Sequence, residues 1–253
     1  MQVYQERPHR NLTEIMKLRI KFKKYGPVRF IGHLDVMRFF QKAMRRAQIP
    51  IAFTGGYSPH MIMSFAQPLG IGLTSDAEYM DIELAGEISS SEALQALNQV
   101  MAEGIEVLSF RQIAEDKKSS GMTIVAAADY LVTVKESDSK GQGFPDFWEN
   151  ELKNFLDSPE ILIMKKTKRS EKETDIRPLI YQMELREQGM YLKLAAGSEA
   201  NLKPDLVMDA FYDKSGHDKK EKLHFHRLEL YAKNPGSQES RFCTLESLGT
   251  DIV

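Results

Sequence analysis

The sequence predicts an α+β fold built as two tandem ferredoxin-like (βαββαβ) domains. Apolar and basic residues alternate along residues 17–25, as in a half-buried strand. Apolar residues recur every three or four positions over 33–48, as in an amphipathic helix, and a similar order of strands and helices returns after residue 129. The length of 253 residues is ample for two hydrophobic cores.

The first strand and the first helix each have one apolar and one basic side. Along residues 17–25, one strand face carries Leu18, Ile20 and Phe22. The other face carries Lys17, Arg19, Lys21 and Lys23. In the helix over 33–48, which Pro50 ends, the side opposite the apolar arc carries Arg38, Lys42, Arg45 and Arg46.

The remaining elements of the first domain follow from local signals. Short strand segments flank a Gly/Pro-rich loop at 54–60, and a longer strand covers 78–84. Ser89 and Glu92 form a capping box that starts a second helix, which Gly104 is expected to close. A strand at 105–110 completes the βαββαβ order.

The second domain shows a looser version of the same order. Helices are expected around Trp148, where Ser158-Pro159 stops the pattern, and over 205–212. The expected strands are 130–135, 161–166, 179–185, 190–194 and 224–231. The predicted organisation is a flexible extension at 1–15, a domain at 16–114, a linker at 115–128, a domain at 129–232 and a flexible tail at 233–253.

Cys243 is the only cysteine, so the chain forms no internal disulfide, zinc finger or iron–sulfur cluster by itself. We therefore expect no cofactor, and a reducing cytoplasmic environment. His224 and His226 share a strand face at a spacing known for metal ligands, but no third ligand is identifiable, so no metal site is predicted. No apolar run approaches the roughly 20 residues of a membrane span.

Charge is unevenly distributed although the net charge is only −2. Ten Lys and Arg residues against one acid lie between Lys17 and Arg46, and ten acids against one base lie between Thr74 and Asp116. This asymmetry predicts a basic face for a polyanion such as RNA, and an acidic face for a protein partner. The alternative is two solvated surfaces without a ligand.

Two shorter motifs suggest chemistry or binding. His33 and Asp35 start the basic helix, where the histidine is either an oriented general base or a structural residue of the turn. The loop over 55–72 is rich in glycine and proline, and its side chains either stack on nucleic-acid bases or hold the loop on the sheet. These side chains are Tyr57, Ser58, His60, Ser64 and Phe65.

A third stretch, residues 164–180, concentrates basic side chains on an expected hairpin. They would neutralise phosphates, or form a solvated hairpin together with Glu171 and Glu173. The candidate phosphate contacts here are Lys165, Lys168, Arg169 and Arg177.

The ordered set of motifs resembles the radical-SAM-linked family of uncharacterised bacterial domains over residues 16–232. The motifs are Phe30-Ile-Gly-His33-Leu-Asp35, Arg38, Arg45-Arg46-Ala47, Gly56-Tyr57-Ser58-Pro59-His60, Ser64-Phe65-Ala66, Glu78-Tyr79-x-Asp81, Lys168-Arg169 and Asp175-Ile-Arg177-Pro178. Members are fused to, or encoded beside, a radical SAM enzyme, so the resemblance implies such a partner and a role in RNA or ribosome modification. After His60 this chain has Met61 and Ile62, where many members carry Pro and Lys.

We therefore expect a non-catalytic RNA-binding or substrate-presenting module that acts with a separately encoded radical SAM enzyme. Tandem ferredoxin-like domains with His33 near the first helix also resemble the CRISPR repeat-processing endoribonucleases, although their C-terminal glycine-rich signature is absent. That resemblance gives the alternative of a metal-independent endoribonuclease that uses His33. An interaction scaffold that binds no nucleic acid is the third interpretation.

Overall fold

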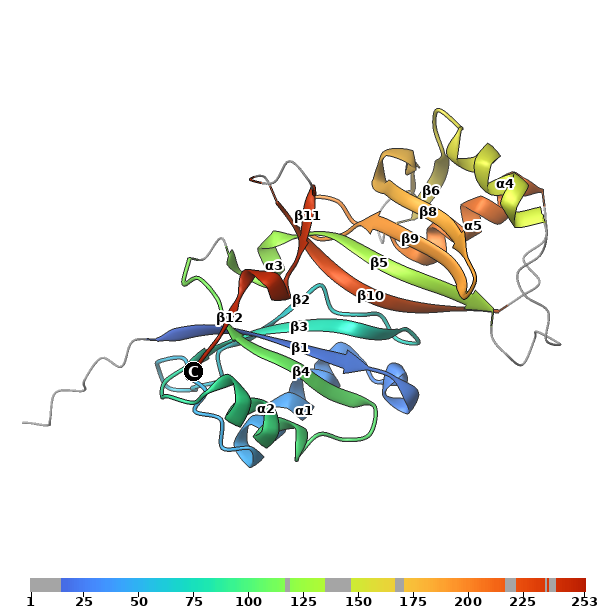
Figure 1. Cartoon of the computed structure of the whole chain (residues 1–253). Coiled ribbons are helices and arrows are strands. Elements are labelled where there is room, and N and C mark those ends of the chain that lie inside the picture. Colours follow the sequence, from blue (N-terminus) through green and yellow to red (C-terminus); the bar gives the residue numbers. More distant parts are fainter. Residues whose placement is uncertain are drawn as a thin grey trace, which may run out of the picture.

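The computed structural model describes residues 15–116, 119–134, 147–166, 171–216, 222–234, 236 and 240–253. The predicted extension up to residue 14 lies outside these residues, as do Lys168 and Arg169. The fold is mixed α+β, with one large sheet and a small two-stranded sheet (Figure 1). Within the described chain, no helix is long and apolar enough to cross a membrane.

The first half contains two helices and four strands, in the order predicted from the sequence. Its elements are β1 (Met16–Lys24), η1 (Gly26–Phe30), α1 (His33–Arg46), β2 (Met63–Ala66), β3 (Thr74–Leu84), α2 (Ser90–Asn98) and β4 (Ile105–Gln112). The strands lie side by side as β4-β1-β3-β2, and each pair is antiparallel. Leu18, Ile20 and Phe22 are fully buried against α1 and α2, which lie on the same side of these strands (Figure 1).

The second half repeats this strand order with a hairpin added. Its elements are β5 (Val125–Val134), α4 (Phe147–Leu156), β6 (Leu162–Lys166), β7 (Glu171–Asp175), η3 (Arg177–Leu179), β8 (Ile180–Arg186), β9 (Gly189–Ala195), α5 (Pro204–Ser215) and β10 (Leu223–Lys233). The strands β10-β5-β9-β8 are neighbours and antiparallel, while β6 and β7 pair only with each other. Trp148, Phe155 and Phe211 bring α4 and α5 together over this sheet.

The two halves meet through their strands. At the start of β3, Thr74 and Ser75 pair in parallel with His226 and Arg227 of β10, so the strands of both halves form one ten-stranded sheet. This pairing was not predicted, because two short strand segments 152 residues apart leave no joint signal in the sequence.

The predicted linker is shorter in the structure than in the sequence analysis. A short helix, α3 (Gly121–Ile124), precedes β5, which begins at Val125. Residues 125–128 therefore belong to a strand and not to a linker, and Ala127 and Ala128 are fully buried. The predicted linker thus overlaps the start of β5, because the exact end of an element is the feature that a sequence pattern defines least well.

The expectation of a loose tail is wrong for residues 242–251. β11 (Phe242–Thr244) pairs with β10, and β12 (Thr250–Asp251) pairs with β4 of the first half. Between them, Leu245 is fully buried and η4 (Glu246–Leu248) turns the chain. The segment from Phe242 to Asp251, called the C-terminal segment below, thus connects the two halves (Figure 1).

Gly104 has a different role from the predicted helix end. The capping box is present, because Ser89 Oγ accepts from Glu92 N and the Glu92 carboxylate accepts from Ser89 N, but α2 already ends at Asn98. Gly104 lies in the turn before β4 with φ +93°, and a Cβ there would come within 2.6 Å of the Tyr25 carbonyl oxygen. Glycine is required because two loops approach each other closely at this point.

Candidate nucleic-acid interface

The exposed side of α1 is the part of the predicted interface that faces solvent. Val36, Phe40 and Met44 are buried on the inner side of the helix, which leaves the basic residues on the outer side. We call Arg38, Lys42, Arg45 and Arg46 the basic helix face; all four are exposed. Arg45 and Arg46 also lie in the last helical turn, where positive charge interacts favourably with the helix dipole.

The basic face of β1 is not exposed in the same way, and Arg19 shows this most clearly. Its side chain is 2% exposed and forms a bidentate ion pair with Asp81 of β3, at 2.8 and 2.9 Å. It also donates to the carbonyl oxygens of Ser119 and Leu245. The expectation that Arg19 faces a polyanion is therefore wrong: the linker and the C-terminal segment cover it.

Lys21 is held between two acids that are more than 200 residues away. Its ammonium lies 2.8 Å from Glu229 and 2.9 Å from Glu246, and these carboxylates raise the pKa of Lys21 despite its partial burial. Lys17 donates to the carbonyl oxygen of Glu115. Of the four basic residues predicted on this face of β1, Lys21 is thus also unavailable to a phosphate.

Lys23, the last of these four, lies near Glu106 at 3.8 Å and remains partly exposed. Two acids of β3 are likewise paired inside the protein. Glu78 is buried beside Arg227 at 2.7 Å, and Asp81 binds Arg19. The acidic face expected to meet a protein partner therefore lacks these two carboxylates.

His33 and Asp35 do not form an acid–base pair. The ring of His33 packs edge-on against Phe65, with centroids 5.0 Å apart, while Asp35 binds Arg38 at 3.1 Å. Partial burial, with a smaller contribution from Lys24, lowers the pKa of His33. The N-cap of α1 is Gly32, so His33 starts the helix without capping it through its side chain.

The motif loop closes as a small hairpin in which His60 is structural. Thr54 Oγ1 lies 3.0 Å from His60 Nδ1 and accepts from the His60 amide at 3.1 Å. Tyr57 at the tip is fully exposed and Ser58 is exposed, whereas Phe65 is 6% exposed and packs between Phe22 and Phe40. Ser64 is half-buried in β2. The structural interpretation therefore applies to His60 and Phe65, whereas base stacking by the exposed Tyr57 stays a prediction.

In the basic stretch of the second half, Arg177 is engaged within the fold, whereas Lys172 is exposed. Arg177 donates through Nε to the carbonyl oxygen of Leu156, so it satisfies the C-terminal end of α4. Its own amide donates to Asp175 Oδ1. Lys165 lies in β6, and Lys168 and Arg169 are among the residues that the structure does not describe.

The two histidines on β10 lie at the junction of the halves, where both contact Thr74 of β3. Thr74 Oγ1 lies 2.9 Å from His224 Nε2 and 2.7 Å from His226 Nδ1, and His226 Nε2 lies 2.9 Å from Asp76. Among the described residues, no group of three His, Cys, Asp or Glu side chains is arranged to hold a metal ion.

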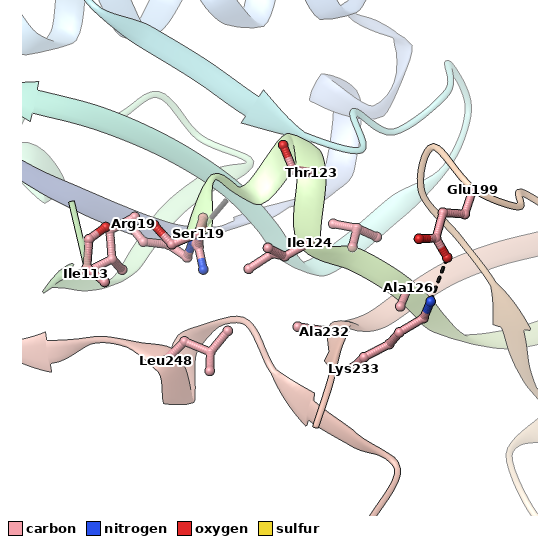
Figure 2. A pocket seen from close by; sticks show the side chains of 12 residues that line it. Arg19, Ile113, Ser119, Thr123, Ile124, Ala126, Glu199, Ala232, Lys233 and Leu248 are labelled. Atoms are coloured by element: carbon pink, nitrogen blue, oxygen red, sulfur yellow. Dashed lines mark hydrogen bonds and ion pairs between the residues drawn. The ribbon is translucent and has the colours of Figure 1, made fainter. Parts of the chain in front are cut away.

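A cavity of about 380 Å³ lies where the linker meets the C-terminal segment (Figure 2). Figure 2 shows Arg19 and Ser119 at one end, and the ion pair between Lys233 and Glu199 at the other. Its charged groups are already paired, and much of the remaining lining is apolar, including Ile124 and Leu248. The cavity therefore offers no free positive charge for a phosphate.

Comparisons with known proteins give a family but no activity. No curated protein matches the sequence. The crystal structure of an unknown protein from Galdieria sulphuraria is 8% identical, covering 85% of this chain and 99% of that chain, with a TM-score of 0.24. A likeness at that score carries no inference. A family model matches residues 17–204, which is more than half of the chain. The chain therefore belongs to DUF2344, a family described as an uncharacterized protein conserved in bacteria.

Proposed function

We propose that this protein is a non-catalytic RNA-binding module that presents RNA to a separate radical SAM enzyme. The observation that carries the proposal is the basic helix face, whose four cationic side chains remain exposed while those at Arg19 and Lys21 are neutralised internally. Cations left on one continuous helical surface bind a phosphate backbone through its charge, without reading the base sequence. The radical SAM partner follows from the family resemblance alone.

We further propose that the two halves are ferredoxin-like units joined edge to edge. Each half places its strands in the order fourth, first, third, second, with antiparallel neighbours, once the β6–β7 hairpin is set aside as an insertion. This order is that of the ferredoxin-like plan, with both crossover helices on one side of the sheet.

Charge reversal on the basic helix face tests RNA binding. The variant Arg38→Glu/Lys42→Glu/Arg45→Glu should bind a structured RNA weakly, and the magnitude of the slope of log K against log salt should fall by about three. The matched control, Lys153→Glu/Lys214→Glu/Lys222→Glu, makes the same change in net charge at three exposed sites in the second half. Binding that is equally weak in both variants, or unchanged in the first, would contradict the proposal.

The partner is tested separately. Purified protein and a separately encoded radical SAM enzyme from the same genome should co-elute in gel filtration. Deletion of this protein should abolish the modification that the partner enzyme makes on its RNA. If the enzyme modifies its RNA equally well without this chain, the presenting role is excluded.

A further inference from the structure

A second cavity, of about 480 Å³, lies at the junction of the two halves, between the β2–β3 loop and the start of α5. Gln67 and Gly70 line it from the first half. Tyr130, Lys203, Phe225 and Arg227 line it from the second. A cavity of this size and of mixed polarity accommodates a small organic ligand, and sites between two structural units are common positions for one.

One end of this cavity is suited to an anion. The 12-residue helix α5 begins there, and its N-cap residue, Lys203, makes no side-chain capping hydrogen bond. Pro204 has no amide hydrogen, and the amides of Asp205 and Leu206 have no acceptor within the helix. Such amides, the positive end of the helix dipole and the exposed ammonium of Lys203 favour a phosphate or carboxylate at this point.

Arg227 provides an independent indication of a ligand. Its side chain is 1% exposed in the wall of the cavity, and it donates to the Gln67 carbonyl oxygen at 2.8 Å and to Glu78 at 2.7 Å. Among the described residues, its Nε atom has no hydrogen-bond partner. A buried donor without an acceptor costs free energy, which a ligand oxygen would recover.

The other walls suit a flat, weakly polar group. Tyr130 and Phe225 supply aromatic rings, and Pro68, Leu69 and Leu73 supply aliphatic surface. Aromatic walls of this kind stack on nucleobases. The exposed carboxylate of Asp205, also at the cavity, can accept from a ribose hydroxyl.

We propose that this cavity binds a nucleoside monophosphate, either free or as the phosphorylated end of an RNA. The base lies against Tyr130 and Phe225, and the phosphate lies at the start of α5 beside Lys203. The β2–β3 loop connects the cavity with η1, which precedes α1, because Gly72 N donates to the Arg29 carbonyl oxygen at 2.8 Å. In the RNA-end form the inference rests on the proposed function, and the basic helix face then holds the backbone that leads to the cavity.

Two variants and one matched control test the cavity. Lys203→Glu places a negative charge beside the phosphate, and should weaken binding of AMP and CMP about tenfold to a hundredfold in calorimetric titrations. Gly70→Phe adds a ring at the cavity wall, where a Cβ would meet only Leu73 Cδ1 at 3.9 Å, and should have a similar effect. Gly236→Phe adds the same ring at an exposed position between β10 and β11, where nothing lies within 4 Å of a Cβ, and should bind like wild type.

The two sources of the ligand are separated with a short oligoribonucleotide, with and without a 5′-phosphate. Tighter binding of the phosphorylated oligonucleotide than of AMP assigns the RNA end, and equal binding assigns the free nucleotide. Inorganic phosphate that binds as well as AMP would overturn the nucleoside assignment. Nucleotide binding that is absent from wild type, or unchanged in folded Lys203→Glu and Gly70→Phe, would overturn the site.

Failure of this site and failure of the proposed function are distinguishable. The charge-reversed basic helix face should lose RNA but retain AMP, since Arg38, Lys42 and Arg45 do not line the cavity. Gly70→Phe should lose AMP while still binding the backbone of a longer RNA in a salt-dependent way.

Discussion

At the scale of single residues, the alternating pattern of β1 predicted the core residues but not the burial of the basic ones in ion pairs. Alternation along β1 identified two faces, and it correctly assigned Leu18, Ile20 and Phe22 to the core. It did not show that a second layer covers the basic face, because the covering residues come from positions 119 and 245. The basic run and the acidic run instead lie on neighbouring strands, where Arg19 is directly opposite Asp81.

The ion pair between Arg19 and Asp81 gives the first prediction. Arg19→Met should lower the free energy of unfolding by about 3–5 kcal/mol, because it leaves the Asp81 carboxylate largely buried without its partner. Arg19→Met/Asp81→Leu should recover much of this loss, since both charges are then absent. Urea denaturation measures both values. Lys233→Met, which breaks an exposed pair with Glu199, is the control and should cost less than about 1 kcal/mol.

His33 gives a prediction about pH. Since burial lowers its pKa in the folded protein, the unfolded chain takes up the proton first as the pH falls through about 6.5. His33 therefore contributes stability at neutral pH that is lost on acidification. His33→Phe keeps a ring against Phe65 and removes the titration, so its stability should change less between about pH 7.5 and 5.5. An NMR titration that places the pKa of His33 above 6.5 would contradict this account.

At the scale of elements, the long periodic segments were predictable and the short polar ones were not. The prediction of a helix over 33–48 agrees with α1, and the capping box correctly located the start of α2. β11 and β12 were missed because strands of three and two residues are too short to show an alternating pattern. They are strands only because they pair with β10 and β4. The helical period also identified the basic helix face, whereas the cavity beside α5 depends on contacts between the halves.

The capping box supplies a prediction for an element. Ser89→Ala removes the acceptor for the Glu92 amide, and should lower the free energy of unfolding by about 1 kcal/mol. Gln95→Ala, an exposed change within the same helix, should be close to neutral because alanine has the higher helix propensity. Equal losses in the two variants in thermal denaturation would show that the cap has no special role.

At the scale of the whole molecule, the C-terminal segment determines whether the halves behave as one unit. It pairs with β10 and with β4, and it carries Glu246, one of the two acids that bind Lys21. Leu245 belongs to the core of the second half, while its carbonyl oxygen accepts from Arg19 of the first. Both halves therefore depend on the same ten residues.

Leu245→Ala tests this dependence. The cavity left by a fully buried leucine should lower the free energy of unfolding by about 2–5 kcal/mol. Leu248→Ala, at a position that is 45% exposed, should cost much less. Fluorescence of Trp148 in the second half and hydrogen exchange at β1 in the first should report the same transition. Destabilisation confined to one half would show that the segment does not couple them.

The position of the C-terminal segment also has a consequence for the protein during its own synthesis. Domains generally fold as they leave the ribosome, the N-terminal one first. Here the β1–β4 sheet emerges long before Glu229 and Glu246, so Lys21 has neither acid and Arg19 lacks its cover until translation has passed residue 246. The nascent first half thus exposes the face of β1 that the complete protein covers, and its final form is reached only when residues 242–251 close over it.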